Sequence, residues 1–352
     1  MKQRILVAPL NWGIGHACRC IPIINALLEN KFEVVIASDS EALCLLKKEF
    51  PNLEFAELPS YNVTYSKNKS QFKRHLIKQL PKIYFAIRAE HKATQHIIKT
   101  FKIDAIISDN RLGVYSKKLK SVFITHQLHV LSGKTTVLSS KLHEHFIKNF
   151  DTCWVPDFEG LPNLSGKLSH SSNKKQPIPI TYIGALSRFE PLETELKTDI
   201  LVLLSGPEPQ RSLLALKLLE ELKKTSKKII FVKGVIENNQ TKIIEGSITI
   251  YNFLTTKDLQ IALNEANLVI CRSGYTSVMD LAKLNKKVFF IPTPGQFEQE
   301  YLAQHLEEQK IAPFCCQDEF TLEQLDTVKT YKGFLNLDFN KTIDKKLFDW
   351  FR

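Results

Sequence analysis

The chain has 352 residues, of which 43% are hydrophobic and 24% charged, a balance typical of a soluble globular protein of about two domains. No apolar run approaches the roughly 20 residues of a membrane-spanning helix, and no apolar leader precedes the first expected strand. We therefore expect a cytoplasmic protein, at most peripheral on the inner face of the plasma membrane. A net charge of +11 favours an anionic partner, namely a phosphate-bearing substrate, an acidic membrane surface or nucleic acid.

The first half of the chain alternates apolar strand patterns with amphipathic helix patterns, which predicts a doubly wound α/β sheet. Its expected strands are Arg4–Leu10, Phe32–Ser38, Leu53–Leu58, Asp104–Ser108, Ser121–Thr125, Thr152–Val155 and Thr181–Gly184. The first helix is expected from Ala17 to Asn30. In such sheets, ligands bind to loops at the carboxyl ends of the strands.

The loop after the first strand contains Gly13 and Gly15, as the start of a dinucleotide-binding loop would. Asp39 also stands near the position of a ribose-binding acid. However, Cys18 occupies the place of the third glycine, so we do not expect a nicotinamide or flavin cofactor.

The most unusual composition lies in residues 67–102, where ten Lys or Arg residues accompany a single acid, Glu90. Aromatic and aliphatic residues are interleaved with these charges. A basic amphipathic helix of this kind can lie on an anionic membrane surface. The alternative is a helix that packs on the core and exposes a basic outer face. RNA-binding motifs and stacking aromatic motifs are absent, so nucleic acid is an unlikely partner.

The second half repeats the alternation of strands and helices after a boundary that we place between Arg188 and Thr198. Its expected strands are Ile200–Leu204, Lys228–Val232, Ser247–Ile250, Leu268–Cys271 and Val288–Pro292. We predict three segments, residues 1–188, 198–335 and 336–352. The last segment contains an amphipathic helix pattern that begins near Thr342.

Three motifs carry a resemblance to a known family. They are Gly13-Ile14-Gly15-His16, Arg272-Ser273-Gly274 with Asp280, and the stretch Pro292–Gln299. Together they resemble glycosyltransferase family 28, whose MurG-like members transfer N-acetylglucosamine from UDP to lipid-linked acceptors. The resemblance implies the GT-B fold, an α/β architecture of two Rossmann-like domains whose parallel sheets face an interdomain cleft. It also implies that the C-terminal helix packs back on the N-terminal domain.

The resemblance implies that the C-terminal domain binds a nucleotide-diphosphate sugar, usually a UDP-sugar. Asp280 would accept hydrogen bonds from both ribose hydroxyls, a role that suits a carboxylate, whereas a capping box with Ser277 is the alternative. Gln299 matches the first of two amide side chains that contact the donor sugar; Glu300 replaces the second, and Gln296 lies near enough to substitute. The full expected donor-side set is Ser205, Gly206, Arg211, Phe253, Leu254, Arg272, Ser273, Gly274, Asp280, Gln296, Gln299 and Glu300.

The expected phosphate loop follows the first strand of the second half. Pro207 and Pro209 remove two backbone donors from this loop, which leaves Ser205, Gly206 and Arg211 for phosphate contact.

His16 and Arg188 are the expected catalytic residues by resemblance. His16 would be the general base that deprotonates the acceptor hydroxyl, which a histidine can do near neutral pH. The alternative for His16 is a residue that binds phosphate or caps backbone at a helix start. Arg188 would neutralise the leaving diphosphate, with a surface arginine in the linker as its alternative. The expected acceptor-side residues are Gly13, Gly15, Asp109 and His126.

No metal ion or cofactor is expected. The chain has no Asp-x-Asp motif, and Cys18-x-Cys20 and Cys315-Cys316 lack the spacing of metal ligands. The leading prediction is an inverting, metal-independent glycosyltransferase that moves a hexosyl group from a nucleotide-diphosphate sugar to a hydroxyl of an unidentified acceptor. That acceptor would be lipid-linked if the basic segment lies on a membrane. The alternatives are a nucleotide-sugar epimerase on the same fold and a non-catalytic binder of nucleotide-sugar or nucleic acid.

Overall fold

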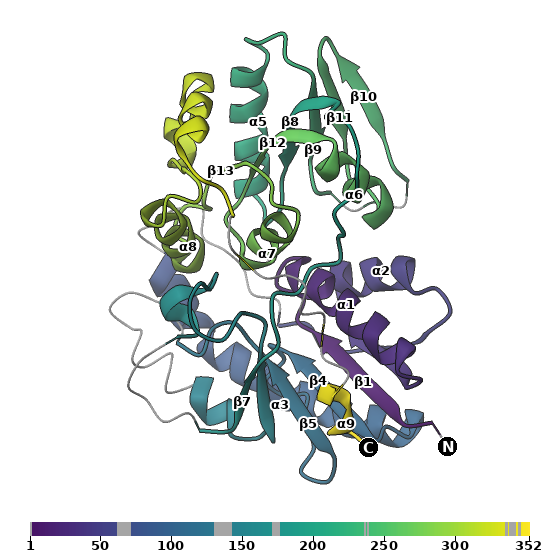
Figure 1. Cartoon of the computed structure of the whole chain (residues 1–352). Helices are drawn as coiled ribbons and strands as arrows, with labels where there is room; N and C mark the ends of the chain where they lie inside the picture. The colour runs from purple at the N-terminus through teal and green to yellow at the C-terminus, as the bar shows by residue number, and fades with distance from the viewer. Residues whose placement is uncertain are drawn as a thin grey trace. The chain divides into compact units, whose positions relative to one another are not determined.

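The computed structural model describes residues 2–61, 72–129, 143–170, 177–235, 237, 239–334, 337, 343 and 346–352, and between residues 72 and 80 it describes only the helical backbone. The described residues form two compact α/β units. The first is built from the chain up to Leu186 together with the C-terminal residues, and the second from Ser187 to Leu337 (Figure 1).

The first unit contains a seven-stranded parallel sheet in the order β3-β2-β1-β4-β5-β6-β7. Its strands are β1 Arg4–Pro9, β2 Glu33–Ser38, β3 Glu54–Glu57, β4 Ala105–Asp109, β5 Lys120–Ile124, β6 Thr152–Val155 and β7 Ile180–Tyr182. Its helices are α1 Gly15–Glu29, α2 Ser40–Glu49, α3 Phe72–Phe101 and α9 Lys346–Asp349, with a 3-10 turn η3 at Gly166–Leu168.

Helices cover both faces of this sheet. Leu6 and Ala8 of β1 and Val35 of β2 point to one face, where they share a core cluster with Ile97 of α3. Since successive side chains of a strand alternate, the remaining residues of β1 and β2 point to the opposite face. α1 and α2 lie against these strands and against each other (Figure 1).

The strand order of the first sheet reverses between β1 and β4. Pro9 and Asp109 pair at the carboxyl ends of these two strands. In open parallel sheets, ligands bind at such a reversal point, so this edge is the first place to look for a site.

Helix α3 contains most of the basic segment 67–102, although residues 67–71 lie outside the described part of the chain. Ile87, Glu90 and Ile97 are buried, so one side of the helix packs on the core. The opposite side carries exposed Lys and Arg residues, as the core-packing alternative predicts. The same side also carries two exposed aromatic side chains, Tyr84 at 49% and Phe85 at 67%. A helix face that contacts only water does not need aromatic residues.

The second unit contains a six-stranded sheet in the order β10-β11-β9-β8-β12-β13, parallel except for the β10–β11 pair. Its strands are β8 Thr198–Leu203, β9 Ile229–Val232, β10 Lys242–Glu245, β11 Ile248–Tyr251, β12 Ala266–Cys271 and β13 Val288–Phe290. Its helices are α5 Gln210–Leu222, α6 Thr256–Asn264, α7 Tyr275–Lys283 and α8 Phe297–Glu308, with 3-10 segments η4 Gln317–Glu319 and η5 Leu322–Thr330.

One large core cluster joins the second sheet to α5 and η5. Leu214 and Leu218 of α5 and Val328 of η5 pack with the strands on this face. α6 lies against β8 and β12. Strand β10 was missed by the sequence analysis because Ile243 and Ile244 are both exposed at the sheet edge, so its pattern lacks the alternation of a half-buried strand.

The C-terminal helix α9 packs on the first unit. Phe348 and Phe351 both contact Phe32 and Trp154, with ring centroids 5.8–6.3 Å apart. All four rings are at most 5% exposed. The helix spans four residues within the eleven-residue pattern that the sequence indicated, part of which lies outside the described residues.

Candidate active site

Four polar side chains meet at the reversal point of the first sheet. Asp109 ends β4, and His16 and Arg19 lie on the first two turns of α1. The Nδ1 atom of His16 is 2.9 Å from Oδ1 of Asp109, and Nε of Arg19 donates to Oδ2 of Asp109 at 2.6 Å. A second nitrogen of Arg19, Nη2, donates to Oδ1 of the same carboxylate. His126, in the loop after β5, lies with Nδ1 2.9 Å from Nη1 of Arg19.

Burial and charge set the ionisation of this cluster. Burial alone would raise the pKa of Asp109, but Arg19 and His16 outweigh it and hold that pKa well below its ordinary value. Burial lowers the pKa of His16, Asp109 opposes this effect, and Arg19 adds to it. The net result is a neutral imidazole beside an ionised carboxylate at neutral pH, which is the state that a general base needs.

His16, Asp109 and His126 were predicted from the sequence as site residues, whereas Arg19 was not. Arg19 is 1% exposed and connects the other three. The sequence feature that could have revealed Arg19 is its three-residue spacing from His16, which puts both side chains on one face of a helix.

The glycine loop shapes the start of α1. Gly13 has a φ of +81°, a conformation that favours glycine, and α1 begins at Gly15 rather than at Ala17 as expected. His16 is therefore a first-turn residue whose side chain is 15% exposed. No side chain caps α1 at its N-cap, Ile14.

Asp39 does not resemble a ribose-binding acid in its contacts. It forms an ion pair with Arg111, whose guanidinium also donates to Glu90 at 2.8 Å. Arg111 and Glu90 are completely buried, and Tyr61 donates to Glu90 at 2.8 Å. The single acid of the basic segment thus neutralises a core arginine.

In the second unit, a glycine occupies the N-cap position of α7, after the turn that follows β12. Gly274 has no side chain to accept from the first backbone N–H groups. A Cβ at Gly274 would meet nothing within 4 Å, so the fold has room for a side chain at this position. Ser273, by contrast, is fully buried and donates to the Gln299 carbonyl at 2.8 Å.

Arg272 does not reach this space. Its guanidinium is 1% exposed and donates to the carbonyls of Ile291, Pro292 and Gln210 at 2.8–3.1 Å. It also donates to Oε1 of Gln317 at 2.6 Å. Burial lowers its pKa to about 10, so it stays charged at neutral pH. These contacts correct the expectation of direct donor contact, since Arg272 ties together the loops after β12 and β13 and the start of α5.

Asp280 lies in the second turn of α7, six residues after the N-cap Gly274. This position excludes the capping box with Ser277, which would require Ser277 to be the N-cap residue. Instead, Ser187 donates to Oδ1 of Asp280 at 2.7 Å. Burial raises the pKa of Asp280 to about 6, and Arg188 opposes that rise.

The segment that opens the second unit is held by side chains of α6 and α7. Nη1 of Arg188 donates to Thr256 at 2.9 Å, and its guanidinium lies 4.9 Å from the Phe189 ring centroid. Lys283 pairs with Glu190 at 2.5 Å. Arg188 therefore belongs to the same neighbourhood as Asp280.

The expected sugar-binding amides lie at the start of α8 and close its loop. Oε1 of Gln299 accepts from the Thr293 backbone at 2.8 Å, and its Nε2 donates to Oε1 of Gln296 at 2.6 Å. Glu300 accepts from the Gly295 backbone at 3.0 Å. The hydroxyl of Thr293 is buried and has no hydrogen-bond partner among the described residues. The amide groups that close this loop can also form hydrogen bonds to the hydroxyl groups of a hexose, in place of their bonds to each other.

The loop after β8 is a poorer phosphate site than the sequence indicated. Glu208 accepts from the Ser212 backbone at 3.2 Å and from Arg211 at 3.1 Å, so a carboxylate already occupies the start of α5. Burial would raise the pKa of Glu208, but the hydrogen bonds from Ser212 and Arg211 lower it. Arg211 also donates to the Gly234 carbonyl at 2.6 Å. Of the expected trio, Ser205 and Gly206 are partly exposed and remain candidates for phosphate contact.

Phe253 and Leu254 are partly buried in the loop after β11, next to the start of α6. The Phe253 carbonyl accepts from Gln240 at 3.1 Å. Their position at the carboxyl end of a strand is compatible with the expected contact to a nucleotide base.

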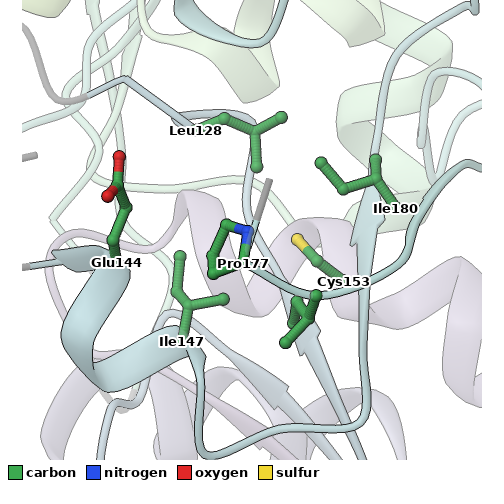
Figure 2. A pocket seen from close by; sticks show the side chains of 7 residues that line it. Leu128, Glu144, Ile147, Cys153, Pro177 and Ile180 are labelled. Carbon is green, nitrogen blue, oxygen red and sulfur yellow. The ribbon is translucent and has the colours of Figure 1, made fainter. Parts of the chain in front are cut away.

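A small apolar hollow lies within the first unit. Figure 2 shows the side chains around it, which come from the loop after β5, the short helix 143–147, β6, β7 and the residues just before β7. The lining residues are Leu128, Glu144, Ile147, Cys153, Pro177, Ile178 and Ile180. The space does not admit a water-sized sphere, so a ligand has no room there.

Neither a metal-binding cluster nor a membrane-spanning helix is found among the described residues. Among them, no group of three or more His, Cys, Asp and Glu side chains is arranged to hold a metal ion. Within the same part of the chain, no helix has the length and apolar content needed to cross a membrane.

Comparison with known families identifies the class of protein. Residues 203–346 match the glycosyltransferase family 28 C-terminal domain, and residues 3–132 match glycosyl transferase family 1. The protein is a nucleotide-sugar glycosyltransferase with the GT-B fold, and its second unit is a family 28 C-terminal domain. The predictions of fold and family from the glycine loop and the Arg272-Ser273-Gly274 motif are confirmed.

Individual relatives are distant but cover nearly the whole chain. The chain is 24% identical over 339 residues to the UDP-N-acetylglucosamine--N-acetylmuramyl-(pentapeptide) pyrophosphoryl-undecaprenol N-acetylglucosamine transferase of Pasteurella multocida, covering 94% of this chain and 88% of that one. Among solved structures, it resembles Acinetobacter baumannii MurG with a TM-score of 0.53 at 15% identity, covering 99% and 92% of the two chains. It also resembles the spinosyn rhamnosyltransferase SpnG complexed with thymidine diphosphate, with a TM-score of 0.62 at 13% identity and coverage of 94% and 93%.

Proposed function

We propose that this protein transfers a hexosyl group from a UDP-sugar to a hydroxyl group of its acceptor, with inversion at the anomeric carbon and without a metal ion. The observation that carries the proposal is the His16–Asp109 pair at the reversal point of the first sheet, in a chain with a glycosyltransferase fold. A buried pair of this kind has the chemistry for removing a proton from a hydroxyl group.

The donor nucleotide binds the second unit in this proposal. The N-terminus of α7 at Gly274 receives the diphosphate, because the helix dipole and the N–H groups of the first turn favour an anion. Asp280 accepts the ribose hydroxyls, and Ser187 holds one carboxylate oxygen so that the other is oriented toward the ligand. Gln299 and Gln296 contact the sugar by exchanging their mutual hydrogen bond for bonds to its hydroxyls.

Proton transfer uses the neutral His16. Its Nδ1–H donates to Asp109, which leaves the lone pair on Nε2 to take the proton of the acceptor hydroxyl. The acceptor oxygen forms a bond to the anomeric carbon from the side opposite to the diphosphate. The bond from that carbon to the diphosphate oxygen breaks, the electron pair leaves with the nucleoside diphosphate, and the configuration inverts. Asp109 then stabilises the imidazolium.

Charge on the leaving diphosphate is stabilised by fixed groups of the second unit. The backbone N–H groups of α7 supply positive ends of dipoles, and Arg188 supplies a full charge in the neighbourhood of Asp280. Preorganised groups of this kind provide a large share of transition-state stabilisation. They can take the place that a metal ion has in other transferases.

An anionic membrane surface is the proposed location of the acceptor. The support is the exposed side of α3, where Tyr84 and Phe85 accompany Lys82 and Arg88. Aromatic side chains insert at the lipid interface while basic side chains attract acidic headgroups. A lipid-linked acceptor would be presented at this surface.

Two rival functions have less support. An epimerase on the same fold would act on UDP-sugar without an acceptor, and a binder would not turn it over at all. Matches to glycosyltransferases over both halves of the chain favour transfer over both rivals.

The test has two stages. Thermal stabilisation by a panel of UDP-, GDP- and dTDP-sugars identifies the donor, and we expect UDP-sugars to raise the midpoint most. Product analysis with that donor and a panel of lipid-linked acceptors then follows, with His16→Ala expected to lose at least about a hundredfold in turnover. Epimerised sugar formed from donor alone, or a fully active His16→Ala enzyme, would contradict the proposal.

Membrane attachment is tested separately with vesicles that contain acidic lipids. The double variant Lys82→Glu with Arg88→Glu should bind more weakly by about 2 kcal/mol or more, roughly 30-fold. The matched control is Lys227→Glu with Lys228→Glu, which changes net charge equally at exposed positions of the second unit. Equal losses in both variants would contradict a specific α3 surface.

A further inference from the structure

The buried Arg19 has a consequence for the two histidines that it contacts. A guanidinium group only donates hydrogen bonds and stays protonated in proteins. Nη1 of Arg19 is 2.9 Å from Nδ1 of His126, so that nitrogen must accept. His126 is therefore a neutral imidazole with its proton on Nε2.

His16 is under the opposite constraint. Its Nδ1 is 2.9 Å from Oδ1 of Asp109, which is ionised and can only accept, so Nδ1 must carry a proton. Nη2 of Arg19 also lies 2.9 Å from this Nδ1, but an unprotonated Nδ1 would direct its lone pair at the ionised carboxylate oxygen 2.9 Å away, which electrostatic repulsion opposes. Nε2 of His16 is therefore the nitrogen with a lone pair.

We propose that Arg19 is a positioning residue that, together with Asp109, holds His16 and His126 in opposite neutral tautomers. His16 can then accept a proton at Nε2, while His126 carries its own proton on Nε2. The role of His16 in catalysis rests on the proposed function, whereas the tautomers themselves do not.

The charges around the two rings are consistent with this assignment. His16 faces Asp109, Arg19 and His126, and burial keeps its pKa lowered. His126 faces Arg19 and also His143, whose own pKa burial lowers to about 4. A second cation at His16 would lie against Arg19 in a buried region, which charge repulsion opposes. The thiol of Cys20 lies 3.6 Å from Asp109 and, with a raised pKa, adds no charge.

The experiment is nuclear magnetic resonance of the full chain labelled with ¹⁵N-histidine. Two-bond ¹H–¹⁵N correlations at pH 7.5 distinguish the two neutral tautomers and the cation, and the signals are assigned by their loss in His16→Gln and His126→Gln. We expect His16 protonated on Nδ1 and His126 protonated on Nε2. His126 protonated on Nδ1, or both rings in the same tautomer, would overturn the proposal without any variant at Arg19.

Variants at Arg19 give the second readout. In Arg19→Gln, His126 should relax toward a mixture of tautomers. The pKa of His16 should rise by about one unit or more, because the negative charge of Asp109 is no longer neutralised by the arginine. Arg19→Lys keeps the charge, so the pKa of His16 should return toward that of the native protein. Arg4→Gln, at a partly exposed ion pair of the same unit, is the matched control and should leave both signals unchanged.

The result separates this inference from the proposed function. Opposite tautomers in a protein that transfers no sugar would leave the inference intact and refute the transferase role of the pair. Sugar transfer by a protein whose two histidines share one tautomer would refute the inference and leave the transferase function intact.

Discussion

Helices α5 and α7 begin at equivalent places in the second unit, each directly after a central parallel strand, yet their N-termini differ. The start of α5 is occupied by Glu208, which accepts from the backbone of Ser212. The N-cap residue of α7 is Gly274, which has no side chain to accept from the helix and has room for one. Both helix ends attract negative charge, but one is already satisfied by a carboxylate of the chain itself. Under the proposed function, we therefore expect an external anion to bind at the N-terminus of α7 and not at that of α5.

The largest expected effect comes from making α7 resemble α5. Gly274→Asp places a carboxylate at the N-cap, where the fold has room for it. Helix capping should be preserved or improved, whereas repulsion should weaken UDP binding by about 3 kcal/mol, roughly 150-fold. Calorimetric titration with UDP measures the change. Gly274→Asn is the matched neutral control, and equal losses in the two variants would show that charge is not the cause.

A smaller loss is expected at the other contact that α7 offers the nucleotide. Asp280→Asn keeps the shape and can still accept from Ser187, but it loses the charged acceptor for the ribose. We expect UDP affinity to fall by about 2 kcal/mol, roughly 30-fold. Asp326→Asn, at an exposed ion pair on η5, is the control and should bind UDP as the native protein does. Unchanged affinity in Asp280→Asn would remove the ribose role.

The pH dependence of nucleotide binding should follow Asp280. With its pKa raised to about 6 by burial, the carboxyl gains a proton as pH falls from 7.5 to 5, and UDP affinity should fall by up to about tenfold. Folding stability should change in the opposite direction. The folded state holds this proton more tightly than the unfolded state, so the stability contributed by Asp280 is present at low pH and lost as pH rises through about 6.

Two measurements separate these effects. Calorimetry with Asp280→Asn subtracts the protonation of UDP itself, because the phosphate of the ligand also titrates near pH 6. Urea unfolding of both proteins reports the stability difference. If the Asn variant shows the same pH dependence of affinity as the native protein, Asp280 is not the titrating group.

The smallest effect is expected from uncapping α5. Glu208→Gln removes the charge at this helix end and should cost less than about 1 kcal/mol of stability, because the Glu208 side chain is 48% exposed. UDP affinity should stay within about twofold. A loss of UDP affinity comparable to that of Gly274→Asp would move the diphosphate site to α5 and cancel the contrast between the two helices.

Much of the fold was predictable from periodicity. β6 was expected at its observed bounds, and most other strands differed by one or two residues, because buried parallel strands leave continuous apolar runs between turn residues. β10 was not predictable, since Ile243 and Ile244 are exposed and its pairing depends on β11. The contacts of Asp39 with Arg111 were equally hidden, because they join residues 72 positions apart.

The positions of the candidate site residues were predictable from the sequence, but their hydrogen-bond and ion-pair partners were not. Resemblance and strand order brought out His16, Asp109 and Asp280, which lie at carboxyl ends of strands or on the helices that follow. Sequence patterns could not show that Arg272 is buried among carbonyl groups, because a basic residue beside a glycine turn has the same pattern whether it binds ligand or backbone. Arg19 was missed for a related reason: a buried arginine is recognised only once its acid partner is known.

The aromatic contacts of α9 affect the order in which this protein can be completed at the ribosome. Phe32 and Trp154 precede the second unit in the chain, but their partners Phe348 and Phe351 follow it. Residues 187–337 are translated before those partners emerge, so the second unit can finish folding while the first unit still has two aromatic side chains uncovered. Helix α9 therefore completes the first unit after the second has been made, and a nascent chain truncated before α9 would carry an incomplete first unit.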